Sequence, residues 1–282
     1  MNASIETAQY HGLPALKLVD PHGGSALVTD FGAHVVSWSP APGDERLYMS
    51  DRAVFDGTKP LRGGIPVVFP QFGPSGPGLR HGFARVSQWD RSDQRAGADY
   101  VQATWRLTAQ SADPVWPHPF ELEYTVNLSR GRLDVELVAL NPGAEPIRFT
   151  AALHSYLAVR EVEEAFVAGL EGVRYQDQTD GNREKTQHER NLRVSDEVDR
   201  IYMETPRTLQ LVSPGRPLVV EQEGFRDTVV WNPWVERVRA FADMPPDGFR
   251  RMICIEAATV ALPVELAPAA QWAGRQSLII PF

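Results

Sequence analysis

The feature that most constrains the fold is a long series of short segments in which apolar and polar residues alternate. Residues 100–107 (YVQATWRL), 120–128 (FELEYTVNL) and 133–140 (LDVELVAL) alternate in this way. Because successive side chains of a strand point to opposite faces of its sheet, each segment predicts an antiparallel strand with one solvated face. Residues 15–19 and 25–29 flank the turn-rich sequence DPHGG and therefore predict a hairpin.

More strands are expected along the chain, whereas helical periodicity is weak. The other predicted strands are residues 33–39, 208–212, 218–221, 228–231, 252–256 and 276–280. Residues 234–243 (WVERVRAFAD) are the best candidate for a short helix, and the polar, turn-rich residues 169–191 predict a surface excursion. With no linker and no repeat, the pattern predicts one all-β domain over residues 1–282, an antiparallel sandwich or barrel with few short helices.

Composition argues against several classes of function. The chain of 282 residues has a net charge of -8, so no general basic field attracts nucleic acid or an anionic membrane. The single cysteine, Cys254, permits no intrachain disulfide, and no metal-spaced histidine cluster or phosphate-binding glycine loop is present. No signal peptide or membrane-spanning apolar run is found, and we therefore expect a cytoplasmic protein.

Residues 61–85 (LRGGIPVVFPQFGPSGPGLRHGFAR) concentrate positive charge in an acidic chain. The segment holds Arg62, Arg80 and Arg85 together with His81, and it contains no carboxylate. A short apolar piece (IPVVFP) is expected to enter the core once, and the remainder is expected to be an irregular surface loop. This loop is a candidate anion-binding site. The alternative is a long omega-type loop whose arginines pair with nearby acids.

Two polar residues lie inside apolar segments. His154 follows an apolar run in residues 148–159, and Glu256 follows Ile253-Cys254-Ile255. Burial would raise the pKa of a glutamate towards the range of a general base. The alternatives are a solvent-facing carboxylate at a strand end and a core histidine with its hydrogen bonds satisfied.

A series of short motifs resembles the hexose-6-phosphate mutarotases, the phosphosugar branch of the aldose 1-epimerase superfamily. The motifs occur in one order from about Ala33 to the C-terminus: Gly63-Gly64-Ile65-Pro66 with Phe69-Pro70, His81-Gly82-Phe83-Ala84-Arg85, Leu153-His154-Ser155-Tyr156, Glu197-Val198-Asp199-Arg200-Ile201-Tyr202, Trp231-Asn232-Pro233-Trp234 and Cys254-Ile255-Glu256. The resemblance implies a β-supersandwich, no metal, no organic cofactor, and interconversion of the α and β anomers of an aldose 6-phosphate.

The resemblance also implies roles for individual residues. His154 matches the family's catalytic histidine and Glu256 its catalytic glutamate, so we expect His154 to be the acid and Glu256 the base. Arg62 and Arg85 match the arginines that hold the anionic end of the substrate. Paired guanidinium donors suit a phosphate dianion, which explains how an acidic protein can bind an acidic ligand.

Three further positions complete the expected site. Asp199 matches a substrate-binding aspartate, and His81 lies where the superfamily places a histidine that contacts the sugar. The chain departs from the family at Arg80, where glutamine is common before the His-Gly motif. A guanidinium there could add a phosphate contact or turn to solvent.

Two alternative functions remain open at this point. One is a non-catalytic protein that binds a sugar phosphate or carbohydrate, and the retention of both His154 and Glu256 argues against it. The other is an epimerase of an unphosphorylated aldose, against which the arginine-rich segment argues. We expect the ligand to be a small hexose phosphate and the protein to be a monomer.

Overall fold

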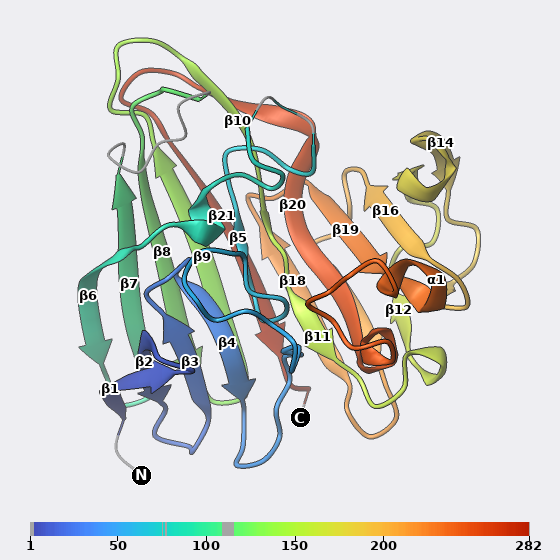
Figure 1. The fold of residues 1–282 in the computed structure, drawn as a ribbon, viewed down its shortest axis with the longest axis horizontal. Coiled ribbons are helices and arrows are strands. Elements are labelled where there is room, and N and C mark those ends of the chain that lie inside the picture. The colour runs from blue at the N-terminus through green and yellow to red at the C-terminus, as the bar shows by residue number, and fades with distance from the viewer. Residues whose placement is uncertain (1–2, 75, 77, 109–115, 282) are drawn as a thin grey trace.

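The computed structural model of the chain describes residues 3–74, 76, 78–108 and 116–281, and in them the strands form three antiparallel sheets (Figure 1). The four-stranded sheet has the order β1 (Ser4–Tyr10), β2 (Leu13–Val19), β3 (Ser25–Thr29), β4 (His34–Ser39). The eight-stranded sheet has the order β14 (Arg183–Thr186), β13 (Arg174–Asp177), β16 (Val198–Tyr202), β19 (Asp227–Asn232), β20 (Met252–Leu266), β10 (Ile147–Leu153), β5 (Val67–Val68), with β11 (Tyr156–Ala158) also paired to β20.

The nine-stranded sheet has the order β15 (Asn191–Arg193), β12 (Phe166–Ala168), β17 (Thr208–Val212), β18 (Leu218–Glu223), β21 (Gln271–Ile279), β9 (Arg132–Leu140), β8 (Glu121–Ser129), β7 (Tyr100–Thr108), β6 (Asp90–Ala96). The helical elements described are α1 (Trp234–Val238) and the 3₁₀ turns η1 (Ala84–Val86), η3 (Val162–Glu164), η4 (Gln178–Asp180) and η5 (Gly248–Arg251). The predicted all-β antiparallel fold class is confirmed. That residues 1–282 form one domain stays a prediction.

Alternation of side chains along the strands decides which residues reach the core and which reach the site. In β8 and β9, every second residue is buried. In β20, Ile255 and Ala257 belong to the main hydrophobic core, whereas Glu256 between them lines a cavity. Figure 1 shows β20 running through the middle of the molecule, between β10 and β19. The period of two along this strand therefore places one carboxyl group on the face opposite to the core.

Several predicted boundaries are wrong, and most errors lie at sheet edges. β1, β6 and the hairpin formed by β13 and β14 have mostly polar or half-exposed side chains, so no apolar alternation marks them in the sequence. Backbone pairing to an inner strand holds such edges instead. The predicted surface excursion at residues 169–191 therefore contains strands of the eight-stranded sheet. The predicted helix ends at Val238, and β20 continues ten residues past the predicted end at Glu256.

The arginine-rich segment is more buried than the sequence predicts. The apolar piece that holds β5 is buried as expected, but Gln71, Phe72 and the stretch from His81 to Ala84 are buried as well. Gly82 has a φ of +69°, and a Cβ there would lie 1.9 Å from the Phe69 carbonyl oxygen. Only glycine fits this close approach of two backbones, which draws the loop inward. Positions 75 and 77 of this segment lie outside the described residues.

His34 predicts a pH dependence of stability. Its ring is fully buried in β4 and its Nε2 lies 2.8 Å from the Gly63 carbonyl oxygen, where it donates a hydrogen bond in the neutral form. Burial, opposed by this bond, lowers the pKa of His34 to about 4. Between pH 6.5 and about 4 the unfolded chain therefore binds a proton that the folded chain does not, and stability is lost as the pH falls.

Titration of His34 should lower the free energy of unfolding by up to about 1.4 kcal/mol per pH unit, which is the largest slope that a single proton can give. Urea unfolding at pH 7 and pH 5 should show a larger loss of unfolding free energy in the native protein than in His34→Gln, which keeps a donor but does not titrate. Equal losses in the two proteins would show that His34 is not the cause.

Among the described residues, no helix has the length and apolar character needed to cross a membrane.

Candidate active site

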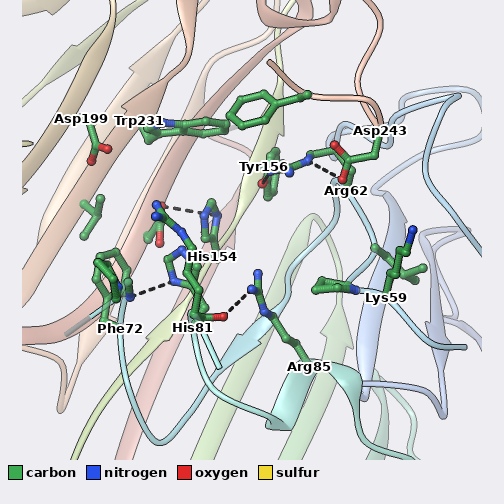
Figure 2. A pocket seen from close by; sticks show the side chains of 18 of the residues that line it. Lys59, Arg62, Phe72, His81, Arg85, His154, Tyr156, Asp199, Trp231 and Asp243 are labelled. Carbon is green, nitrogen blue, oxygen red and sulfur yellow. Dashed lines mark hydrogen bonds and ion pairs between the residues drawn. The ribbon is translucent and has the colours of Figure 1, made fainter. Parts of the chain in front are cut away.

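A cavity of about 570 Å³ opens on the face of the eight-stranded sheet that carries Glu256 (Figure 2). Its walls come from the arginine-rich segment, from β11, β16, β19 and β20, and from the chain between α1 and η5. All the residues that the sequence assigns to the site line this cavity: Arg62, Arg80, His81, Arg85, His154, Asp199 and Glu256. The fold thus gathers side chains that are up to 194 positions apart, from Arg62 to Glu256.

His154 and Glu256 form a buried pair at the floor of the cavity. Leu153 at the end of β10 pairs with Ala257, and Tyr156 at the start of β11 pairs with Cys254, so His154 lies opposite Glu256 by strand register. Nδ1 of His154 is 3.4 Å from Oε1 of Glu256, and the side chains are 9% and 1% exposed. Neither Nδ1 of His154 nor Oε2 of Glu256 has a hydrogen-bond partner within the described part of the chain. Glu256 is therefore not a solvent-facing residue at a strand end.

Burial favours the uncharged form of both groups. It raises the pKa of Glu256 well above its ordinary value, and the negative charge of Asp199 acts in the same direction. Burial also lowers the pKa of His154 well below 6.5, and the guanidinium groups of Arg85 and Arg62 lower it further. In the free protein, burial therefore opposes the form in which both groups are charged.

The buried side-chain amide of Gln276 connects the two chain segments that carry His154 and Glu256. Gln276 of β21 is fully buried, and its Oε1 accepts a hydrogen bond from the hydroxyl of Ser155. Its Nε2 donates to the carbonyl oxygen of Ile255 at 3.0 Å. Ser155 and Ile255 are the chain neighbours of His154 and Glu256, so one side chain of the nine-stranded sheet ties both segments together.

Arg62 is held on one wall of the cavity by three contacts. Its Nη1 donates to the hydroxyl of Tyr156 at 3.0 Å, and its Nε donates to a carboxylate oxygen of Asp243 at 3.2 Å. The guanidinium carbon also lies 4.8 Å from the centre of the Phe241 ring. These contacts fix the plane of the group and leave its Nη2 as a further donor for an anion in the cavity.

Arg85 and His81 also line the cavity, both from the arginine-rich segment (Figure 2). Arg85 donates from Nη2 to the carbonyl oxygen of Arg80 at 2.6 Å, and its buried Nε has no partner within the described residues. Nδ1 of His81 accepts a hydrogen bond from the backbone N–H of Gly73 at 3.2 Å, so Nε2 carries the proton and is a donor. Burial, with the charge of Arg85, lowers the pKa of His81 and keeps its ring neutral.

Asp199 and Arg80 differ in how far they enter the site. Asp199 lies on β16 opposite Trp231 of β19, and burial raises its pKa to about 6 although Arg80 acts against the shift. Its side chain faces the cavity as an acceptor. Arg80 lies on the rim with an exposed side chain, which agrees with a guanidinium that can move between solvent and a bound anion.

Sequence reasoning missed several residues of the wall: Lys59, Tyr156, Trp231, Arg237, Phe241 and Asp243. Tyr156 and Trp231 stand inside quoted motifs, so the motifs themselves could have suggested them. Asp243 meets Arg62 across 181 positions, and no local pattern signals such a contact. Lys59 and Arg237 are exposed cations that nothing in their local sequence sets apart.

His154, Cys254 and Glu256 place potential metal-ligating atoms within 4.8 Å of one another in the described part of the chain. Burial raises the pKa of the Cys254 thiol well above its ordinary value. Because metals bind the thiolate, a protonated thiol makes this set a poor metal site. That the protein uses no metal and no cofactor stays a prediction.

Comparison with known proteins identifies relatives along most of the chain. Residues 14–278 match the aldose 1-epimerase family. A Cenchrus ciliaris protein named "Putative glucose-6-phosphate 1-epimerase" is 32% identical over 260 residues, which cover 88% of this chain and 79% of that protein. An Escherichia coli K12 protein of the same name is 31% identical over 234 residues, covering 80% of this chain and 77% of the relative.

A solved structure extends the match to the fold. The crystal structure of a "putative mutarotase" from Salmonella typhimurium has a TM-score of 0.88 at 27% identity, over 98% of this chain and 92% of that one. These findings confirm the resemblance noted in the sequence, and the chain belongs to the aldose 1-epimerase family.

Proposed function

We propose that the protein interconverts the α and β anomers of an aldose 6-phosphate, with glucose 6-phosphate as the substrate to test first. One observation carries the proposal. A buried carboxyl–imidazole pair faces a cavity whose walls also carry Arg62 and Arg85. Membership of the aldose 1-epimerase family and the names of the two relatives support the same isomerase reaction.

The reaction needs two proton transfers. A base removes the proton of the C1 hydroxyl while an acid delivers a proton to the ring oxygen, and the ring opens. The aldehyde end rotates, and closure on the other face reverses both transfers. We assign Glu256 as the base and His154 as the acid, each contributing about 10²- to 10⁴-fold. Because closure returns each proton to its donor, the pair regains its starting state without another reactant.

The charge of the substrate supports this assignment of roles. In the free site, Arg85 and Arg62 disfavour a positive charge on His154. A phosphate dianion bound by these two guanidinium groups offsets much of their positive potential. Phosphate binding therefore favours the imidazolium form of His154, which is the form that an acid requires.

The remaining residues would bind the sugar and select the phosphate. Nε2–H of His81 is a donor for a sugar hydroxyl, and the carboxyl group of Asp199 is an acceptor. Arg80 at the rim could add a third guanidinium to the phosphate. A monomeric state and a cytoplasmic location stay predictions, and light scattering tests the first of them.

Exchange NMR on glucose 6-phosphate at anomeric equilibrium tests the proposal. Exchange between the α and β resonances should accelerate in proportion to the protein concentration, while the ratio of the two anomers stays unchanged. Saturable binding without faster exchange would instead establish a non-catalytic sugar-phosphate binder. Absence of both binding and exchange would refute the proposed substrate.

A further inference from the structure

Tyr156 contacts the proposed acid through its ring. It begins β11 two residues after His154, and it is 3% exposed. The phenol and imidazole rings are parallel, with centroids 4.8 Å apart and an interplanar angle of 9°. Trp231 meets both rings edge-on, with each centroid 6.0 Å away at 80°. The stack fixes the plane of the imidazole, which leaves rotation of His154 little freedom.

The other end of Tyr156 contacts the proposed phosphate site. Its hydroxyl oxygen accepts the hydrogen bond from Nη1 of Arg62, and Asp243 holds Nε of the same guanidinium (Figure 2). Burial raises the pKa of Tyr156 above its ordinary value, so the phenol is neutral at physiological pH. The bond is therefore a charge-assisted one from a guanidinium to a neutral oxygen.

We propose that Tyr156 is a positioning residue that sets the imidazole of His154 with its ring and the guanidinium of Arg62 with its hydroxyl. The proposal rests on the proposed function and extends it, because it names the side chain that ties phosphate recognition to proton transfer. The bond from Arg62 satisfies the buried hydroxyl of Tyr156 and at the same time fixes the guanidinium at the cavity wall. Positioning matters because a displacement of about 1 Å at a reacting group can cost about 10²-fold in rate.

The two contacts lie at opposite ends of the side chain, so two substitutions separate them. Tyr156→Phe removes the hydroxyl and keeps the ring. It should raise KM for glucose 6-phosphate about 10-fold, the lower range for losing a hydrogen bond to a charged group, while kcat for that sugar and kcat/KM for glucose stay unchanged. Tyr156→Leu removes the stack and should lower kcat by about 10-fold or more on both sugars.

A double substitution shows whether the hydroxyl acts through Arg62. In an Arg62→Ala background, Tyr156→Phe should change KM for glucose 6-phosphate by less than about 2-fold, because its partner is already absent. Tyr124→Phe is the matched control. Tyr124 is fully buried in β8, and its hydroxyl has no hydrogen-bond partner within the described residues. Its removal should leave both sugars unaffected.

The outcomes are distinguishable from failure of the proposed function, because the native protein is assayed on both sugars in the same series. If the native protein does not act on glucose 6-phosphate, the proposed function fails, and calorimetric binding of this sugar phosphate then tests Tyr156→Phe by the same expected loss. An unchanged KM in Tyr156→Phe, or an equal loss on both sugars, would overturn the positioning role. Tyr156→Phe retains the buried ring, so the test stands even if Tyr156→Leu fails to fold.

Discussion

Replacing Glu256 by glutamine is expected to lower kcat for anomer exchange of glucose 6-phosphate by about 10²- to 10⁴-fold, the range of a lost general base. Glutamine keeps the shape of the side chain but cannot accept the C1 proton. KM should change little, because the proposed phosphate contacts, Arg62 and Arg85, lie on other parts of the cavity wall. The free energy of unfolding should not fall, since a neutral amide is easier to bury than a carboxylate.

A matched control exists on the same strand. Glu265 lies nine positions further along β20 with an exposed side chain. Glu265→Gln replaces a carboxyl group by an amide, as Glu256→Gln does, and it should leave kcat unchanged. His154→Ala should cost about as much as Glu256→Gln, and the double variant little more, because the two groups act as one unit. Near-normal kcat in Glu256→Gln would remove Glu256 from the mechanism.

Removing Arg85 is expected to separate the two classes of sugar. Arg85→Ala should lower kcat/KM for glucose 6-phosphate by about 10- to 100-fold, as expected for the loss of one or more hydrogen bonds to a phosphate. Turnover of free glucose should not fall, because glucose carries no anion for Arg85 to hold. Loss of its charge also weakens the repulsion that lowers the pKa of His154, which favours the acid form.

Arg95→Ala provides the control for charge alone. Arg95 lies on the edge strand β6, and its side chain is 66% exposed. Arg95→Ala removes one positive charge, as Arg85→Ala does, but it should affect neither sugar, because exposed charges are screened by solvent and salt. Equal losses on glucose 6-phosphate and glucose in Arg85→Ala would show that Arg85 supports the site as a whole and does not select phosphate.

Local patterns predict the inner strands of this fold and fail at its edges. β8 and β9 are visible in the sequence because each buries every second side chain. β1 and β6 bury few side chains and gain their structure from backbone pairing to β2 and β7, which leaves no apolar signature. β20 is longer than the sequence predicts. Beyond Ala258 most of its side chains are partly or fully exposed, so the apolar pattern ends before the strand does.

The candidate site shows the same division between local and long-range information. Glu256 and His154 are both visible in the sequence as polar residues inside apolar segments, and the family resemblance supplies their expected roles. Asp243 and its contact with Arg62 follow only from the folded backbone, which brings the chain after α1 against the arginine-rich segment. The sequence predicts a helix that includes Asp243. The helix instead ends at Val238, and Asp243 lies in the turns that follow it.

Polarimetry of two freshly dissolved sugars tests whether the protein acts on the phosphosugar in preference to the free sugar. Pure α-glucose 6-phosphate and pure α-glucose are each followed to equilibrium with the same concentration of native protein, and the rates without protein are subtracted. We expect a large catalysed rate for the phosphosugar and a much smaller one for glucose. Equal catalysed rates, or a faster rate for glucose, would contradict phosphate selection by Arg62 and Arg85.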